Sequence, residues 1–286
     1  MEIGIVGQGY VGTAVKVVFE KFYNVYTHDI NKELCNCSSL EDLVNKTNII
    51  FICLPTPMNI DGSCNLQIVR DVIKDIDYIA GQLNCHKTIA IKSTVLPGTS
   101  DKINNQSKNI SVLFNPEFLT EANFINDFKN QNRIILGGEN DELVKIENLY
   151  SLVFPNVPIL KTSSTVAEMI KYFTNTYLAT KVSFANEMKL ICEFLEINYE
   201  KVVEYAKYDE RLGESHWSVP GPDGHYGFGG SCFPKDVNAL ISFCKDNNIL
   251  AKTLMGAWET NLKVRPEKDW EQLKGRAITN NKKDID

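Results

Sequence analysis

The chain has 286 residues, of which 43% are hydrophobic and 23% charged, and its formal net charge is −6 at pH 7. This length accommodates two domains, and the composition is that of a globular protein and excludes a largely disordered chain. The negative charge argues against general affinity for nucleic acids, although a local basic pocket could still bind an anionic substrate.

The amino-terminal 29 residues predict a dinucleotide-binding unit. Residues 1–6 read as a buried strand, Gly7-Gln8-Gly9-Tyr10-Val11-Gly12 follows without a gap, and helical apolar spacing begins at Thr13. A second strand then ends on Asp29. Strand, glycine turn, helix, strand and acid in this order are typical of a nucleotide-binding βαβ unit.

Each glycine of this turn has an expected role. Gly7 permits the tight turn, Gly9 lets a pyrophosphate reach the helix amides, and Gly12 allows the helix to pack closely on the strand. Asp29 would accept hydrogen bonds from the adenosine ribose hydroxyls and repel a 2′-phosphate. The pattern therefore favours NAD over NADP.

Strands and helices alternate through about residue 160, which predicts a parallel, doubly wound sheet. Further strands are expected at 48–54, 88–93, 111–114, 133–136 and 157–160, and helices at 66–83 and 141–152. Ligands of such sheets bind beyond the carboxyl ends of the strands. The segments at 54–57 (LPTP), 93–99 (STVLPGT) and 115–122 (NPEFLTEA) fall at these ends.

The pattern becomes helical near Ser163, where Ser163 or Ser164 could cap a helix with Glu168 in its first turns. Its periodicity runs to about residue 197, and shorter helices are expected at 200–208, 234–247 and 250–263. Residues 211–230 are rich in glycine and proline and are expected to form a loop. A loop of this length in a compact domain usually has a function, so we expect it to take part in ligand binding.

We therefore expect a Rossmann-type α/β fold with a mainly parallel sheet, followed by an all-helical domain. The expected divisions are 1–161 for the NAD-binding domain, 162–265 for a helical dimerisation domain and 266–286 for a charged tail whose end at 280–284 looks frayed.

Residues 227–236, GFGGSCFPKD, place a cysteine at the mouth of a helix. Pro234 suits the first helical position, so Cys232 would lie beside unpaired N–H groups and the positive end of the helix, which favour a thiolate. A thiolate next to a general acid or base is the nucleophile of a covalent mechanism. A glycine loop with a buried structural cysteine is the alternative interpretation.

Other candidate residues are weak when taken singly. Lys171 and Asn175 share a helix face, which is usually only a solvated edge. Glu117 and Glu121 follow a strand end and could be an ordinary acid pair. Thr94 could orient a water molecule.

Taken together, these segments resemble the UDP-glucose/GDP-mannose dehydrogenase family over roughly residues 1–260. The resemblance rests on GQGYVG, CLPTPM, STVLPGT, NPEFLTEA, the helix AEMIKYFTNTYLATKVSFANE and GFGGSCFPKD. It implies that two NAD are used to oxidise the primary alcohol of a nucleotide sugar, with UDP-glucose as the expected substrate, to a carboxylate.

The resemblance also implies roles for single residues. Cys232 would capture the aldehyde as a thiohemiacetal that is oxidised to a thioester, which water hydrolyses. Lys171 would stabilise negative oxygen with the help of Asn175, and Asp236 would work with this lysine as a base. The expected catalytic residues are Cys232, Lys171, Asn175, Asp236, Glu117 for acid–base work during hydrolysis, and Thr94 for positioning water.

Two further sets follow from the same resemblance. The expected cofactor-binding residues are Gly7, Gly9, Tyr10, Val11, Gly12, Asp29, Lys32, Thr56, Thr94, Glu121 and Lys235. The expected substrate-binding residues are Glu117, Phe118, Leu119, Lys171, Asn175, Arg211, Phe228 and Gly229. Arg211 resembles an arginine that family members insert into a neighbouring subunit, which implies a homodimer.

The compartment and the partners are also constrained. Residues 1–6 enter a strand at once, so we expect no signal peptide, and no segment approaches the apolar length of a membrane span. The eight cysteines are scattered, and no CxxC pairs or accompanying histidines indicate a metal site. We expect a reducing, cytoplasmic compartment, no metal, and neither a membrane nor a nucleic acid as partner.

The chain departs from the family in length, because typical members continue with a second α/β domain that supplies much of the nucleotide pocket. It could be a naturally short member completed by its 211–230 loop and a dimer partner, a chain that needs a second polypeptide, or a non-catalytic relic that binds NAD. The presence of all the candidate catalytic residues favours the first explanation. A single-step β-hydroxyacid dehydrogenase and a binding protein without turnover remain as alternatives in function.

Overall fold

The computed structural model describes residues 1–280, apart from the side chain of Asn140, and comprises two compact units. Unit 1 contains Met1–Thr56 and Leu66–Lys171, whereas unit 2 contains Pro57–Asn65 and the chain from Tyr172 onwards. This division differs from the one expected at 161/162, because the first part of a long helix stays with unit 1 and a short excursion from unit 1 joins unit 2. The expected frayed end at 280–284 lies almost wholly outside the described residues.

Unit 1 is built on a seven-stranded sheet with the order β2-β1-β3-β4-β5-β6-β7. The strands are β1 (Glu2–Val6), β2 (Asn24–His28), β3 (Ile49–Ile52), β4 (Lys87–Ile91), β5 (Ile110–Phe114), β6 (Ile134–Gly137) and β7 (Ile159–Thr162). All neighbours pair in parallel except β5 and β6, which meet in antiparallel fashion at Phe114 and Gly137. The predicted Rossmann-type, mainly parallel α/β fold is therefore confirmed.

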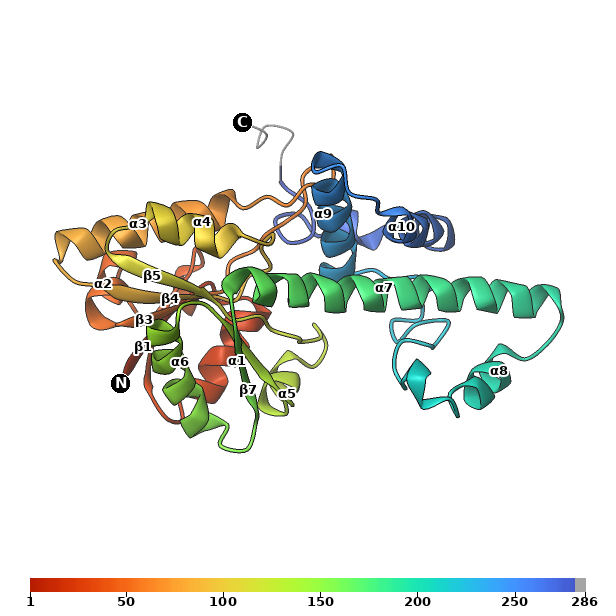
Figure 1. Ribbon diagram of the computed structural model, residues 1–286, viewed down its shortest axis with the longest axis horizontal. Helices are drawn as coiled ribbons and strands as arrows, with labels where there is room; N and C mark the ends of the chain where they lie inside the picture. Colours follow the sequence, from red (N-terminus) through yellow and green to blue (C-terminus); the bar gives the residue numbers. More distant parts are fainter. Residues whose placement is uncertain (281–286) are drawn as a thin grey trace. The chain divides into compact units, whose positions relative to one another are not determined.

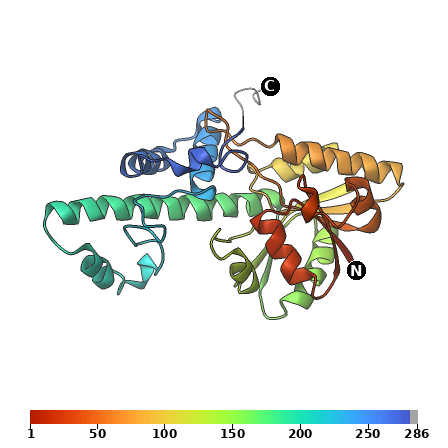
Figure 2. The ribbon, with the colours of Figure 1, turned by 180° about the vertical axis from the view of Figure 1, so that it is seen from behind.

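Helices cover both faces of this sheet. They are α1 (Tyr10–Phe19), α2 (Leu40–Lys46), α3 (Gln67–Gln82), α4 (Thr99–Gln106), α5 (Phe124–Lys129) and α6 (Asn140–Val153). In Figure 1, α2, α3 and α4 lie above the sheet and α1, α5 and α6 beneath it, and Figure 2 shows the same two layers from behind. Burial on both faces explains why β3 and β4 have no exposed residue.

Aromatic rings fill the lower layer. Phe19 of α1 packs edge-on against Tyr150 of α6 with 5.3 Å between ring centroids, and it lies 5.7 Å from Phe51 of β3. These three side chains are completely buried. Their packing fixes α1, and with it the glycine turn that precedes α1, against the sheet.

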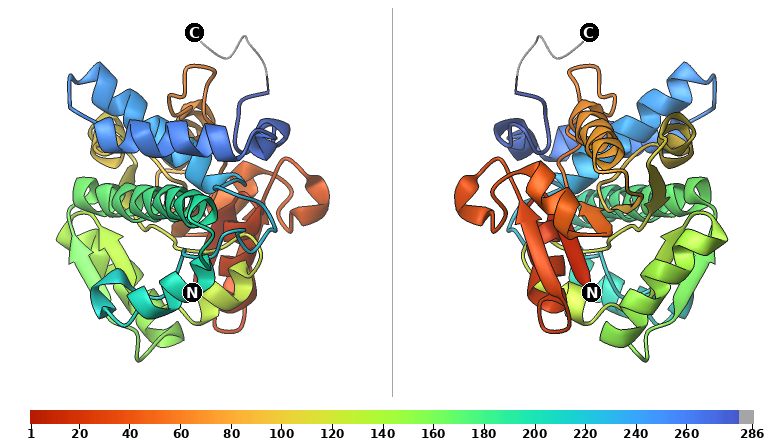
Figure 3. Two further views of the ribbon diagram at one scale, coloured as in Figure 1. Left: turned by 90° about the vertical axis from the view of Figure 1, so that its right-hand side faces the viewer. Right: turned by 90° about the vertical axis from the view of Figure 1, so that its left-hand side faces the viewer.

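Unit 2 is helical, with α7 (Ser164–Phe194, starting in unit 1), α8 (Tyr199–Ala206), α9 (Cys232–Asp246) and α10 (Lys252–Val264), and short 3-10 helices at Glu210–Leu212 and Asp269–Gln272. In its core, Ala179 of α7 and Val237 of α9 pack with Phe228 and Trp258. Figures 1 and 3 show α9 beside α10.

The segment expected as a charged tail is partly folded into unit 2. Trp270 is buried, and its cluster includes Met58 from the excursion Pro57–Asn65. The amide of Met58 donates to the carbonyl of Ala277 at 2.9 Å, and the amide of Thr279 donates to the carbonyl of Met58 at 3.0 Å. Residues up to 280 therefore belong to the folded body of unit 2.

Within residues 1–280, no helix is both long enough and apolar enough to cross a membrane.

Candidate active site

The fold requires glycine at two of the three glycine positions in the turn after β1. Gly7 has a φ of +92°, and a Cβ there would collide with the carbonyl of Cys53. A Cβ on Gly12 would collide with the carbonyl of Gly7. These two glycines therefore pack the start of α1 against the ends of β1 and β3.

Gly9 is different. It has a φ of −68°, which any residue adopts, and a Cβ there would meet no atom of the chain within 4 Å. Nothing inside the fold requires glycine at this position, which caps the amino terminus of α1. A group that approaches the helix amides from outside accounts for it, as a pyrophosphate does.

Asp29 joins the end of β2 to this turn. Its Oδ2 accepts from the amide of Gln8 at 2.6 Å, and its Oδ1 accepts from the amide of Asn31 at 2.8 Å. A carboxylate has about four acceptor positions, so two are left for the hydroxyls of a ribose. The turn, the helix end and this carboxylate fit a dinucleotide without a 2′-phosphate.

The other expected cofactor residues lie around the same edge of unit 1, except Lys235, which lies on α9 of unit 2. Tyr10 opens α1 and lies 5.0 Å from the ring of Phe124, and Val11 packs on the core below the sheet. The remaining residues are Thr56 and Thr94, which are buried beyond β3 and β4, Lys32, which is exposed on the 3-10 helix Lys32–Leu34, and Glu121, which is half-buried before α5.

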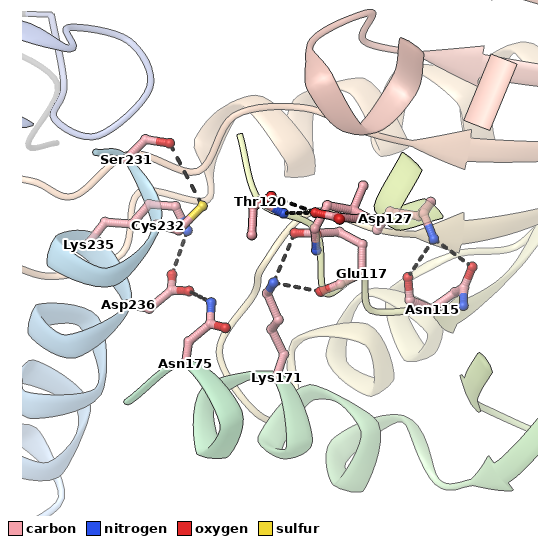
Figure 4. A network of polar contacts seen from close by, with 12 residues as sticks. Asn115, Glu117, Thr120, Asp127, Lys171, Asn175, Ser231, Cys232, Lys235 and Asp236 are labelled. Atoms are coloured by element: carbon pink, nitrogen blue, oxygen red, sulfur yellow. Dashed lines mark hydrogen bonds and ion pairs between the residues drawn. The ribbon is translucent and has the colours of Figure 1, made fainter. Parts of the chain in front are cut away.

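Glu117 and Lys171 form a buried ion pair within unit 1. Lys171 Nζ lies 2.9 Å from Glu117 Oε1 and also donates to the Glu117 carbonyl at 2.6 Å (Figure 4). Burial alone would raise the pKa of Glu117, but the ammonium of Lys171 and the amide of Leu119 hold this pKa below its usual value. The carboxylate is therefore ionised at neutral pH, and its partner is a compact cation.

The residues next to Glu117 reinforce this pair. Lys171 Nζ lies 5.5 Å from the ring centroid of Phe118, and the guanidinium of Arg133 lies 4.3 Å from the same ring. The amide of Leu119 donates to Glu117 Oε2 at 2.7 Å. The structure thus brings Glu117, Phe118, Leu119 and Lys171 together, as the sequence predicts.

A second buried lysine beside this group was not predicted. Lys92 is the first residue after β4, and its Nζ donates to Asn115 Oδ1 at 3.0 Å and contacts the Tyr150 hydroxyl at 3.3 Å. Burial lowers the pKa of Lys92 to about 8. The only feature of the sequence that could have indicated this buried lysine was its position at the end of an apolar strand.

Glu168 also has a role that its expected place in a capped first turn does not reveal. Its carboxylate accepts from the amides of Gly98 at 2.6 Å and Ser100 at 2.8 Å, and it is fully buried. Burial raises the pKa of this carboxyl group. Glu168 thereby fixes the 93–99 loop, which carries Thr94, to the start of α7.

In unit 2, α9 begins at Cys232 itself, with Ser231 as its capping residue. Pro234 is therefore the third helical residue, whereas we expected it to be the first. This is physically sound because the first four amides of a helix lack intrahelical partners, so a proline at the third position loses no bond. Cys232 is therefore itself the first residue of the helix, instead of lying two residues before it.

A chain of buried polar contacts lies one turn below the thiol. Lys235 Nζ lies 2.5 Å from Asp236 Oδ1, and Asn175 Nδ2 donates to Asp236 Oδ2 at 2.6 Å (Figure 4). Burial alone would lower the pKa of Lys235, but Asp236 and the Cys232 sulfur raise it above its usual value. The cation therefore persists beside the thiol, where it favours the negatively charged sulfur.

Three residues of unit 2 that we expected to bind the substrate, Phe228, Gly229 and Arg211, contact other residues of unit 2. Phe228 is buried in the core with Val237 and Trp258, and a Cβ on Gly229 would collide with Arg265 and Asp269. Arg211 lies on the 3-10 helix Glu210–Leu212, and its exposed guanidinium pairs with Asp209 of the same turn. Their roles in binding a sugar therefore stay predictions.

Comparisons with known proteins agree with these observations. Residues 24–153 match the NAD-binding domain of the UDP-glucose/GDP-mannose dehydrogenase family, and residues 165–263 match its central domain. The chain is 29% identical to the UDP-glucose 6-dehydrogenase AglM of Haloferax volcanii, over 96% of this chain and 73% of that protein. It is 32% identical to the UDP-glucose 6-dehydrogenase TuaD of Bacillus subtilis, over 92% of this chain and 63% of that protein.

A solved structure gives the same result. The fold matches a UDP-glucose dehydrogenase from Pyrobaculum islandicum with a TM-score of 0.84 and 27% identity, over 95% of this chain and 70% of that one. The chain thus spans only 63–73% of the lengths of these three relatives.

Proposed function

Since the chain belongs to the UDP-glucose/GDP-mannose dehydrogenase family, we propose that it oxidises the C6 alcohol of UDP-glucose to the carboxylate of UDP-glucuronate. The observation that carries the proposal is the thiol of Cys232 at the start of α9, one turn before the buried contacts among Lys235, Asp236 and Asn175. The names of the relatives support UDP-glucose as the substrate.

In this proposal the glycine turn and Asp29 hold NAD. The bound cofactor would supply the hydride acceptor in each of two oxidations. Thr56, Thr94, Glu121 and Lys235 are assigned to cofactor binding by family resemblance.

The first oxidation needs a base for the C6 hydroxyl proton and a cation beside the oxygen. We assign the base to Asp236, whose oxygens are already oriented by Lys235 and Asn175, and the cation to Lys171. Lys171 and Asn175 are four residues apart on α7, so both point to one side of that helix. The product of this step is an aldehyde.

Cys232 then carries the intermediate. Its thiolate attacks the aldehyde carbon, a C–S bond forms and the oxygen takes a proton, which gives a thiohemiacetal. Loss of a hydride and of the hydroxyl proton in the second oxidation gives a thioester. The covalent bond keeps the reactive aldehyde in place while the cofactor is exchanged.

Hydrolysis releases the product. Water, positioned by Thr94, attacks the thioester carbon as Glu117 takes its proton, and the C–S bond breaks with the thiolate as leaving group. Lys171 stabilises the negative oxygen of the tetrahedral intermediate. The ionised state of Glu117, which follows from its lowered pKa, is the state that a base requires.

The experiment is a turnover assay of the purified chain with NAD and a panel of UDP- and GDP-sugars, in which both NADH and acid are measured. We expect two NADH for each acid formed and no net turnover in Cys232→Ser. Cys85→Ser, which changes a half-buried thiol of unit 1, is the matched control and should retain activity. Full activity of Cys232→Ser would favour a single-step hydroxyacid dehydrogenase, and NAD binding without turnover on any sugar would favour a binding protein.

We also propose a homodimer in which Arg211 serves the partner's site. Large apolar side chains are exposed along α7, among them Phe173, Tyr177 and Phe194, and a second copy would cover them. The test mixes the two inactive variants Arg211→Ala and Cys232→Ser after dissociation. If Arg211 acts on the neighbouring subunit, random pairing should restore about a quarter of the wild-type activity, whereas action within one chain restores none.

A further inference from the structure

The loop Gly227–Gly230, immediately before the capping residue of α9, is held by side chains that follow it in the sequence. Gly227 and Gly230 have φ values of +67° and +69°, which only glycine adopts without strain. Glycine also has the most freedom to lose on folding. A loop of this composition must therefore be held from outside if the cysteine after it is to stay in one place.

Asn261 of α10 makes the first of these contacts. Its Oδ1 accepts from the amide of Phe228 at 2.7 Å, and its Nδ2 donates to the carbonyl of the same residue at 3.0 Å. The side chain is fully buried and pairs with the loop backbone as a neighbouring strand would. A Cβ on Gly227 would collide with this amide, so glycine allows the close approach.

Asp269 and Arg265 make the second contact. Asp269 Oδ2 accepts from the amide of Gly230 at 2.9 Å, and Asp269 Oδ1 accepts from Arg265 Nε at 2.7 Å. Arg265 is buried, and its guanidinium also reaches the carbonyl of Tyr226 at 3.3 Å and the carboxylate of Asp223 at 2.8 Å. One buried guanidinium thus orients the carboxylate that binds the loop.

We propose that Asn261, Arg265 and Asp269 are positioning residues for Cys232 in the proposed oxidation, and we call them the loop clamp. The inference rests on the proposed function. The clamp grips Phe228 and Gly230 within four residues of the thiol, and Gly229 has no room for a side chain beside Arg265 and Asp269. Burying the polar side chains of Asn261 and Arg265 beside one short loop is costly compared with apolar packing, which indicates that the geometry of this backbone is what they maintain.

The consequence concerns the position of the sulfur. The amino terminus of α9 and the ammonium of Lys235 both favour a thiolate at Cys232, and both effects decline steeply with distance. A loosened loop lets Cys232 move away from them. The thiol should then ionise and react only at higher pH.

The test replaces Asp269 by Asn. The asparagine side chain has one acceptor oxygen and one NH2 donor group. It therefore cannot accept hydrogen bonds at both of its ends, from the Gly230 amide and from Arg265 Nε. We measure alkylation of Cys232 by iodoacetamide from pH 5 to pH 10, peptide by peptide with mass spectrometry. In Asp269→Asn the pH of half-maximal alkylation should rise by about one unit.

Asp223→Asn is the matched control, because it removes the other carboxylate of Arg265 and leaves the bond to Gly230 in place. Its alkylation profile should stay that of the wild type. An unchanged profile in folded Asp269→Asn, or an equal shift in Asp223→Asn, overturns the proposal. If Asp269→Asn does not fold, Arg265→Lys tests the same point, because lysine keeps the charge but its single nitrogen cannot span the partners that Nε, Nη1 and Nη2 of Arg265 reach separately.

The readout separates this proposal from the proposed function, because alkylation needs neither NAD nor a sugar. A selective shift in Asp269→Asn with no wild-type turnover on any nucleotide sugar would support the clamp and refute the proposed oxidation. In an active enzyme, Asp269→Asn should lower kcat about tenfold or more and change the Kd for NAD much less, because the glycine turn and Asp29, which we propose hold NAD, lie in unit 1.

Discussion

Asn175 Nδ2 donates a 2.6 Å hydrogen bond to Asp236 Oδ2, and both side chains are almost completely buried. The other oxygen of Asp236 binds Lys235. Each oxygen of this carboxylate therefore has a strong donor, one from α7 and one from α9. A carboxylate held at both oxygens cannot rotate, which is the property that a positioned base requires.

Replacing Asn175 by Ala should leave Asp236 Oδ2 without its donor in a buried place. We expect unit 2 to lose about 1–3 kcal/mol of stability and the turnover number to fall more than the KM for the sugar rises. Urea unfolding followed by tryptophan fluorescence measures the stability. Asn238→Ala is the control, since it removes a bond to the Pro234 carbonyl on the same helix without touching Asp236. An Asn175→Ala enzyme with wild-type kcat would contradict the role assigned to this pair.

The ion pair between Glu117 and Lys171 should be visible as an acid-dependent stability. The pKa of Glu117 is lowered in the folded chain, so the carboxyl binds its proton less readily there than in the unfolded chain. Its contribution is therefore complete above the unfolded pKa of about 4.3 and is lost as the pH falls through the folded pKa. Glu117→Gln should destabilise unit 1 by about 3 kcal/mol at pH 7, because it leaves a buried ammonium without a counter-charge.

The difference between wild type and Glu117→Gln should shrink as the pH is lowered from 6 toward 3, which denaturant unfolding at several pH values measures. Glu147→Gln is the control, because Glu147 forms a half-exposed pair with Lys161, and its loss should cost less than about 1 kcal/mol. A difference that does not vary with pH would show that the carboxylate charge is not what stabilises the pair.

The glycine turn yields a prediction that separates folding from binding. Gly12→Ala puts a methyl group against the Gly7 carbonyl and should cost about 1–3 kcal/mol or more. Gly9→Ala meets no atom of the chain and should change stability by less than about 0.5 kcal/mol, yet it should weaken NAD binding about tenfold or more. Thermal unfolding and calorimetric titration with NAD measure the two effects. Wild-type NAD affinity in Gly9→Ala would refute the role assigned to Gly9.

The inner strands of unit 1 could be predicted closely from the sequence because they are largely buried on both faces and read as short apolar runs between turn residues. The residues 111–114, for example, coincide with all but the first residue of β5. The helices α2, α4 and α5 have only six to eight residues and were not predicted, because so short a segment seldom shows a clear apolar period, although α8 with eight residues was predicted. Tertiary packing, rather than local preference, makes these segments helical.

The candidate site was predictable where residues follow strand ends or a helix start, as Asp29, Glu117 and Cys232 do. Lys92, Glu168 and Arg265 could not be found in this way, because each acts through a partner 20 or more residues away in the sequence. Arg265 in addition immediately precedes the segment 266–286, which we expected to be a charged tail. The partners that bury a charged side chain become visible only once the fold brings them together.

The last prediction concerns Lys92, whose ammonium is enclosed by Asn115, Tyr150 and the ring of Phe128. Burial lowers its pKa to about 8, an effect that Lys171 increases and that Cys53 and Glu117 oppose. Between pH 8 and the unfolded pKa of about 10.4, the unfolded chain therefore binds more protons at this site than the folded chain does. Stability from this group must rise with pH across that window.

Lys92→Met removes the titrating group and keeps the length of the side chain. The stability of the wild type relative to Lys92→Met should increase by up to about 3 kcal/mol between pH 7.5 and pH 10, as the displacement of a buried lysine pKa requires. The variant is needed as the reference because Cys53, with its pKa raised to about 12, makes stability fall above pH 9 in both proteins. Urea unfolding followed by circular dichroism measures the effect, and tryptophan fluorescence reports unit 2 separately, since Trp217, Trp258 and Trp270 all lie there. A wild-type advantage that stays constant or decreases over this range would mean that Lys92 is protonated throughout and that its contacts with Asn115 and Tyr150 outweigh the cost of burial.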